Sequence, residues 1–239
     1  MKISLILILF FSFLFQNNIS KERLETKTEG IITYSHKPLG AKKPFEKYLH
    51  FDKNGAWYAH QQEKETVVTE QGYNYYYFNE KENWYYQNDS VYFFRERENY
   101  PNYYARWKAK EIEWEITNET KTIAGFNVTK AIAKAFKEES KLDSYEYRGK
   151  AIAWFTTDVP LSYGPDGYEG LPGLIVKLQY ENYDDTYITT LKNIEYKEID
   201  EWKIPSTEKR IEVERSDAYN PWKLGKKWFK QKAKEMGID

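Results

Sequence analysis

Short aromatic and β-branched runs recur about every ten residues between residues 28 and 107, and this spacing is the feature that most constrains the fold. The runs cover residues 31–34, 56–60, 66–69, 73–78, 83–86 and 90–94, and turn-forming residues separate them. Strands at this spacing are typical of an antiparallel meander. Asn54-Gly55 lies between two of these segments, and the pair favours a type I′ hairpin turn.

The strand pattern continues in the second half of the chain, at residues 114–116, 121–123, 126–136, 145–157, 174–180 and 186–196. Residues 130–136 are rich in alanine and would also suit a helix. The even spacing of Phe126, Val128, Ile132 and Phe136 favours a strand instead, with a turn at Ala124-Gly125. The sequence therefore predicts a mainly β protein, a strongly curved antiparallel sheet or open half-barrel.

The C-terminal segment has a different period. Asn220-Pro221 pairs a cap residue with a proline at the first helical position, and apolar residues then recur at helical spacing among many lysines. This predicts a basic amphipathic helix within residues 216–239. Such a helix docks on the sheet through Trp222, Trp228 and Phe229, or it makes peripheral contact with anionic lipid or an acidic partner.

The N-terminus reads as a secretory signal peptide. Met1-Lys2 precedes an apolar run through Phe15, which is shorter than the roughly twenty residues that a membrane-spanning helix needs. We expect a signal peptide at 1–20, a β domain at 21–215 and a basic helix at 216–239. The chain has no cysteine, which excludes lipid attachment through a cysteine, disulfides and thiol catalysis. The expected location is the periplasm or the extracellular space, without a lipid anchor.

Residues 164–175 combine four glycines and two prolines, and we expect a tightly constrained structural loop. Pro172-Gly173 fits the centre of a type II turn, which would place Gly173 at positive φ. Leu171 and Leu174 should be buried where the chain enters the next strand, and Trp154 should pack from the neighbouring strand. The residues assigned to this structural loop are Gly164, Pro165, Gly170, Leu171, Pro172 and Gly173.

Several motifs occur in a recognisable order: Trp114-Glu115-Ile116, residues 119–126 and 153–160, and the string GLPGLI at 170–175. Over about residues 103–205 the chain resembles the GLPGLI family of Bacteroidetes-type bacteria. The resemblance implies a secreted or periplasmic protein, and it supplies no catalytic residue because that family has no established activity. Many members carry a cysteine where this chain has Val128, so a thiol-dependent role is absent here.

Aromatic side chains are the strongest binding candidates, because such rings stack on sugars or line an apolar groove. Alternatively, the same rings pack in the hydrophobic core and bind no ligand. The candidate ligand-binding residues are Tyr75, Tyr77, Trp84, Tyr86, Tyr92 and Trp107. His50 and His60 flank the Asn54-Gly55 turn and could face each other, but we read them as ordinary histidines and predict no metal site, no cofactor and no catalytic residue.

These features favour a non-enzymatic envelope protein that binds an apolar ligand or a protein partner on an aromatic sheet face. The net charge of −1 gives no case for nucleic acid. One alternative is an envelope hydrolase that uses Asp158 and Asp166 near Arg148, and another is a carbohydrate-binding module. An enzyme should bring polar groups together in one cleft, whereas a binding protein should present an apolar aromatic groove.

Overall fold

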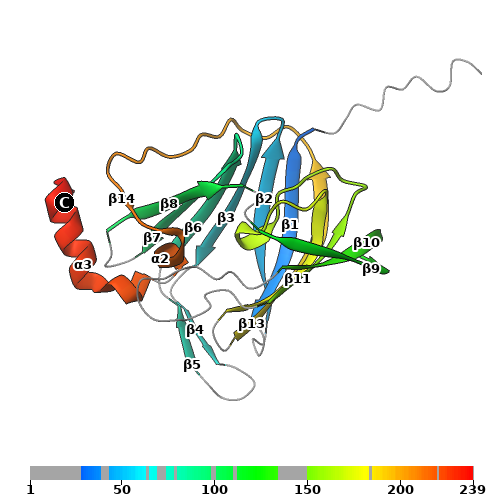
Figure 1. Cartoon of the computed structure of the whole chain (residues 1–239), viewed down its shortest axis with the longest axis horizontal. Coiled ribbons are helices and arrows are strands. Elements are labelled where there is room, and N and C mark those ends of the chain that lie inside the picture. The colour runs from blue at the N-terminus through cyan, green and yellow to red at the C-terminus, as the bar shows by residue number, and fades with distance from the viewer. Residues whose placement is uncertain are drawn as a thin grey trace, which may run out of the picture.

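The computed structural model describes residues 28–38, 43–62, 65–68, 74–77, 80–97, 101–109, 112–133, 150–182, 185–219 and 221–238. Within them, twelve strands form one large sheet (Figure 1). In spatial order they are β14 (Ile211–Glu212), β8 (Tyr103–Lys108), β7 (Ser90–Arg97), β6 (Glu80–Gln87), β3 (Gly55–Gln62), β2 (Phe45–Asp52), β1 (Gly30–Pro38), β13 (Asp185–Tyr196), β12 (Leu174–Asn182), β11 (Ala151–Thr156), β10 (Phe126–Ala133) and β9 (Trp114–Ile123).

The large sheet is open and strongly curved, and a helix follows it at the C-terminus (Figure 1). Neighbouring strands pair antiparallel except β14 and β8, which are parallel. The predicted fold class, a curved antiparallel sheet or open half-barrel with a C-terminal helix, is confirmed. A separate two-stranded sheet joins β4 (Glu65–Val68) to β5 (Asn74–Tyr77), so β3 pairs directly with β6.

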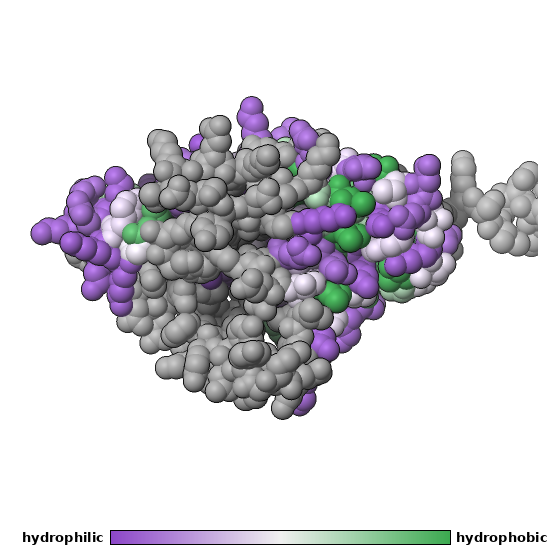
Figure 2. Space-filling view, turned by 60° about the horizontal axis from the view of Figure 1, so that its bottom comes forward, coloured by the Kyte–Doolittle hydropathy of each residue, from purple (hydrophilic) through white to green (hydrophobic). Residues whose placement is uncertain are grey.

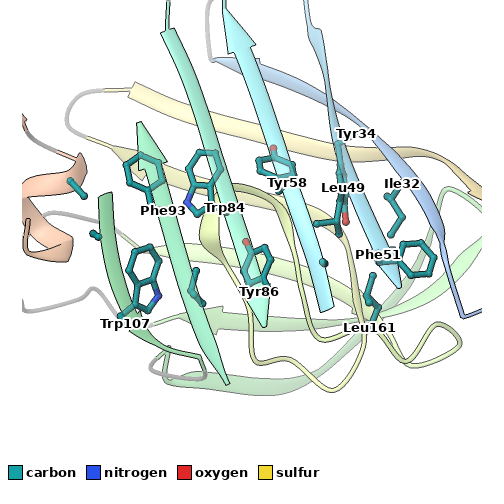
Figure 3. Close-up of a cluster of buried hydrophobic side chains, with 14 of the residues drawn as sticks. Ile32, Tyr34, Leu49, Phe51, Tyr58, Trp84, Tyr86, Phe93, Trp107 and Leu161 are labelled. Carbon is teal, nitrogen blue, oxygen red and sulfur yellow. The ribbon is translucent and has the colours of Figure 1, made fainter. Parts of the chain in front are cut away.

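Alternation along the strands builds the core on the concave face of the sheet (Figure 3). In β2, Lys47, Leu49 and Phe51 are buried, while Glu46 and Tyr48, in the other phase of the strand, are exposed. Because successive side chains of a strand point to opposite faces, a strand such as β2 contributes every second residue to this core. The large side chains on this face include Ile32, Tyr34, Leu49, Phe51, Tyr58, Trp84, Tyr86, Phe93 and Trp107.

Two hairpin turns have the positive backbone angles of a type I′ turn, but Asn54-Gly55 is not one of them. Asn88 and Asp89 join β6 to β7 with φ of 50° and 57°, and Ala124-Gly125 joins β9 to β10 at the expected place. The prediction for Asn54-Gly55 was wrong, because Asn54 does not have positive φ. The Asp52 carboxylate instead stabilises this turn by accepting bonds from the backbone N–H of Asn54 (2.6 Å) and Gly55 (3.1 Å).

The C-terminal helix α3 (Pro221–Met236) follows the short helix α2 (Arg215–Tyr219). Gly225 breaks its regularity with φ of 75°. Phe229 is fully buried, and its ring lies 5.2 Å from the ring of Tyr103 on β8. The helix therefore docks at the β8 end of the sheet, opposite the β9 edge (Figure 1).

The predicted signal peptide lies outside the described residues, as do residues 134–149 of the predicted strands and Arg148. Of the helices that the structure describes, none is long and apolar enough to cross a membrane.

Candidate functional site

The segment 157–173, which contains the predicted Gly/Pro loop, lies against the concave face of the sheet. We call this segment the Gly/Pro segment. The hydroxyl of Tyr86 on β6 donates to the carbonyl of Gly164 (2.9 Å), and the indole N–H of Trp114 on β9 donates to the carbonyl of Glu169 (2.8 Å). Side chains from both halves of the sheet thus hold the backbone of this segment.

Small residues of the sheet make room for the segment. Four alanines of β10 and β11 are buried in one cluster with Tyr168 and Leu171 of the segment. Alanine side chains are short, so the segment can approach the strands closely while its own large side chains fill the space. The four residues are Ala131, Ala133, Ala151 and Ala153.

Gly173 is required for a different reason from the one predicted. Its φ is not positive, so the expected type II turn at Pro172-Gly173 was wrong. A Cβ atom at this position would lie 2.0 Å from the carbonyl oxygen of Thr156, which means that the backbone of β11 occupies the place of a side chain. Leu171 and Leu174 are buried as expected, and Trp154 packs against the cluster that contains Leu174.

Asp166 inserts its carboxylate into a buried polar cluster at the centre of the concave face. The Nζ atom of Lys47 on β2 lies 2.5 Å from Oδ1 of Asp166. The hydroxyl of Tyr58 on β3 donates to the same oxygen (3.2 Å), and the hydroxyl of Thr189 on β13 donates to Oδ2 (3.3 Å). Side chains from three strands, β2, β3 and β13, therefore converge on one loop carboxylate.

His36 on β1 completes the cluster. Its Nδ1 atom lies 2.8 Å from Oγ1 of Thr189 and 3.5 Å from Oδ2 of Asp166. Because the Thr189 hydroxyl gives its one proton to Asp166, the hydrogen in the His36–Thr189 contact comes from Nδ1. His36, Lys47, Asp166 and Thr189 are all buried, and we refer to them with Tyr58 as the Asp166 cluster.

Burial dominates the electrostatics of the neighbouring hydroxyls. Loss of hydration first, and the Asp166 carboxylate second, raise the pKa of Tyr34 and of Tyr58 well above the ordinary phenol value. Both hydroxyls are therefore neutral donors at physiological pH. Tyr34 donates to the carbonyl of Ile175 (2.9 Å), at the start of β12 just after the segment.

The arrangement is suited to holding the segment in place. Asp166 has φ of 56°, a left-handed conformation that Asp tolerates better than most residues. The carboxylate lies opposite Lys47 and accepts hydrogen bonds, so the side chains around it compensate its charge. Asp158, the other carboxylate of the hydrolase alternative, is exposed, whereas Asp166 is buried.

The structure brings three of the six predicted ligand-binding residues together. Trp84, Tyr86 and Trp107 are buried on the concave face. Tyr92 pairs with Tyr85 in the β6–β7 register and so lies on the opposite face. Tyr75 and Tyr77 are on β5, outside the large sheet. The assignment of ligand binding to these rings stays a prediction.

The convex face has an aromatic ladder of its own. His50, Trp57 and Tyr85 stack across β2, β3 and β6, with ring centroids 4.2 and 6.3 Å apart. Their ring faces point at one another. His50 pairs with Trp57 in the β2–β3 register, so the expectation that His50 could face His60 was wrong. Burial, followed by the charge of Lys197, lowers the pKa of His50.

Comparison with known protein families gives a match to part of the chain. A family model described as a protein of unknown function (Porph_ging) matches residues 114–177, which run from β9 through the Gly/Pro segment into β12. This range lies inside the region of the predicted resemblance and likewise matches a family of unknown function, although the match does not show the name GLPGLI. No curated protein matches the chain.

The solved structures that match the chain share little sequence with it. A structure of PNGF-II is 15% identical, with a TM-score of 0.45, and covers 79% of this chain, which spans only 32% of that protein. The lipoprotein LppX of Mycobacterium tuberculosis is 10% identical over 73% of this chain and 91% of its own, with a TM-score of 0.28. LprF of Mycobacterium bovis is 9% identical over 76% and 90%, with a TM-score of 0.31.

The fold and the site together define a class of protein: an open antiparallel half-barrel whose concave aromatic face is partly occupied by a loop. A single buried carboxylate holds that loop to three strands and is within 3.5 Å of a fourth.

Proposed function

We propose that this chain is an exported, non-enzymatic envelope protein that holds an apolar ligand between the concave face of its sheet and the Gly/Pro segment. The observation that carries the proposal is the aromatic lining of one face. Tyr58, Trp84, Tyr86, Phe93 and Trp107 come from four strands, β3, β6, β7 and β8, and point to the same side (Figure 3).

The chemistry of this face suits an apolar ligand. Ligand sites in proteins are mostly apolar, with a few polar groups that fix orientation. Here the hydroxyls of Tyr58 and Tyr86 supply polar groups at the edge of the rings, and both bind the Gly/Pro segment. A ligand that enters along the rings would replace the packing contacts between the rings and the segment. The contacts of Asp166 would still hold the segment to the sheet.

Export is part of the proposal and rests on the apolar run after Met1-Lys2. The resemblance to the GLPGLI family supports the same compartment. The burial of Asp166 and the exposure of Asp158 favour binding over hydrolysis, because a hydrolase would need both carboxylates at one accessible cleft.

Titration with a fluorescent long-chain fatty acid tests the proposal. Energy transfer from the buried tryptophans to the bound probe should reveal saturable binding to the delipidated protein. Ala105→Leu adds volume to the concave face and should weaken probe binding about tenfold or more. The matched control is Ala59→Leu on β3, which pairs with Tyr48 and Asn83 and so lies on the convex face.

The control variant should bind as the wild type does. Equal weakening by both substitutions, or a wild-type protein that does not bind the probe, would contradict the proposed site. Thermal melting of both variants establishes that each remains folded at the titration temperature.

A further inference from the structure

Positive charge is concentrated on α3. Its sequence contains six lysines and one glutamate, which gives a net charge of +5. The net charge of the whole chain is −1, so the residues outside α3 have a net charge of −6. Figure 2 shows hydrophilic side chains gathered at the left end of the molecule, where α3 lies in Figure 1. The near-neutral composition of the whole chain therefore hides a strong asymmetry of charge.

The apolar side of α3 is already in use within the fold. Phe229 and Ala233 are buried against the β8 end of the sheet, and they are four residues apart on one helix face. Docking through this side fixes which lysines face outward. Among residues 224–236 of the helix, the exposed lysines are Lys226, Lys227, Lys230 and Lys234.

Three of the exposed lysines form a stripe. Lys226, Lys230 and Lys234 recur every four residues and so share a face, where like charges repel one another. In the part of the chain that the structure describes, the one ion pair within α3 joins Lys232 to Glu235 (3.5 Å), and no acidic side chain pairs with the stripe. An anionic partner would remove this repulsion.

Two apolar side chains are exposed on the same helix. Trp228 is 36% and Met236 is 44% exposed, and each is two residues from a lysine of the stripe, so both leave the helix on a different side from the stripe. Tryptophan favours the boundary between the headgroups and the acyl chains of a membrane, where its ring is partly buried and its N–H remains hydrated. Lysine pairs there with anionic headgroups.

We propose that α3 docks the protein onto the surface of an anionic membrane through the side of the helix that faces away from the sheet, with exposed lysines on the headgroups and Trp228 inserted at the other border of that side. A lipid surface fits this helix better than an acidic protein, because both an exposed tryptophan and an exposed methionine accompany the charge. The proposal is independent of ligand binding on the concave face.

Vesicle sedimentation tests the docking. The purified protein should bind vesicles that contain about 30% phosphatidylglycerol in phosphatidylcholine, should not bind pure phosphatidylcholine, and should dissociate as salt rises to about 0.5 M. The triple variant Lys226→Gln/Lys230→Gln/Lys234→Gln should bind the anionic vesicles at least about tenfold more weakly.

The matched control removes the same charge elsewhere. Lys53→Gln/Lys150→Gln/Lys203→Gln changes three exposed lysines outside α3 and should leave vesicle binding within about twofold of the wild type. Equal loss in both triple variants would overturn the proposal, because binding would then follow net charge alone.

A second measurement tests the insertion of the ring. Lipids brominated near the headgroup should quench the tryptophan fluorescence of the wild type, and Trp228→Phe should reduce that quenching. Unchanged quenching in the variant would overturn the insertion. Binding to polyglutamate without binding to anionic vesicles would also overturn the proposal, in favour of an acidic protein partner.

Discussion

Asp166 determines how the Gly/Pro segment sits on the sheet, because its carboxylate touches residues from three strands at once. Removing one member of a buried ion pair leaves the other charge uncompensated, at a cost of about 3–5 kcal/mol. Asp166→Asn keeps the shape and tolerates the left-handed backbone, and it leaves Lys47 without its carboxylate.

We therefore predict strong coupling between these two positions. Asp166→Asn and Lys47→Met should each lower the free energy of unfolding by about 3–5 kcal/mol, and the double variant should lose clearly less than their sum. Urea unfolding of the four proteins measures the coupling. Additive losses, within about 0.5 kcal/mol, would mean that the pair does not hold the segment.

Glycine is needed at Gly173 because space is lacking and at Gly125 because the backbone angle is positive. At Gly173 a Cβ would collide with the carbonyl oxygen of Thr156, whereas at Gly125 φ is 83° and no other atom lies within 4 Å of the added Cβ. Gly173→Ala should cost more than about 3 kcal/mol because backbone must move, and Gly125→Ala about 1–2 kcal/mol from conformational strain alone. Chemical denaturation that ranks the two in the reverse order would contradict this account.

The polar residues of the Asp166 cluster could have been found from the strand pattern. His36 continues the inward series of Ile32 and Tyr34, and Lys47 precedes Leu49 and Phe51 in the same phase. A charged residue at an inward position needs a buried partner. The sequence does not show that this partner is Asp166, 119 residues away, because no local period connects a loop to the strands beneath it.

At the level of elements, the helix α3 has adjacent residues with opposite roles. Phe229 is fully buried and packs on Tyr103, while Trp228 is 36% exposed. Phe229→Ala should lower the free energy of unfolding by about 3–5 kcal/mol, and Trp228→Ala by less than about 1 kcal/mol. Thermal and urea unfolding would measure both. Similar losses for the two variants would show that the docked face of the helix is assigned incorrectly.

The strands themselves were largely predictable, because their two-residue alternation is visible in the sequence. The pairing of strands was less so. The even spacing of aromatic runs suggested that residues 66–69 and 73–78 continue the meander, yet β4 and β5 form a separate hairpin and β3 pairs with β6. Spacing indicates where strands are, whereas pairing depends on which faces must be buried together.

At the level of the whole molecule, buried tyrosines make stability depend on alkaline pH. The raised pKa values of Tyr34 and Tyr58 mean that the folded state keeps both phenol protons above pH 10, while the unfolded chain loses them. Stability should therefore be fully present below about pH 10 and fall above it, by up to about 1.4 kcal/mol per pH unit for each tyrosine.

Tyr34→Phe/Tyr58→Phe should flatten this decline. Urea unfolding between about pH 9 and pH 11.5 measures the slope, and unfolding at pH 7 gives the separate cost of the lost hydrogen bonds. An unchanged slope in the double variant would mean that other groups cause the alkaline loss of stability.

The central claim is that an apolar ligand lies between the concave face and the Gly/Pro segment. Photo-crosslinking with a diazirine-labelled fatty acid, in the absence of membranes, tests it most directly. The account predicts adducts on Tyr58, Trp84 and Phe93 or on residues 159–174, which share the concave core. Adducts confined to the convex ladder around Trp57, or to α3, would contradict it.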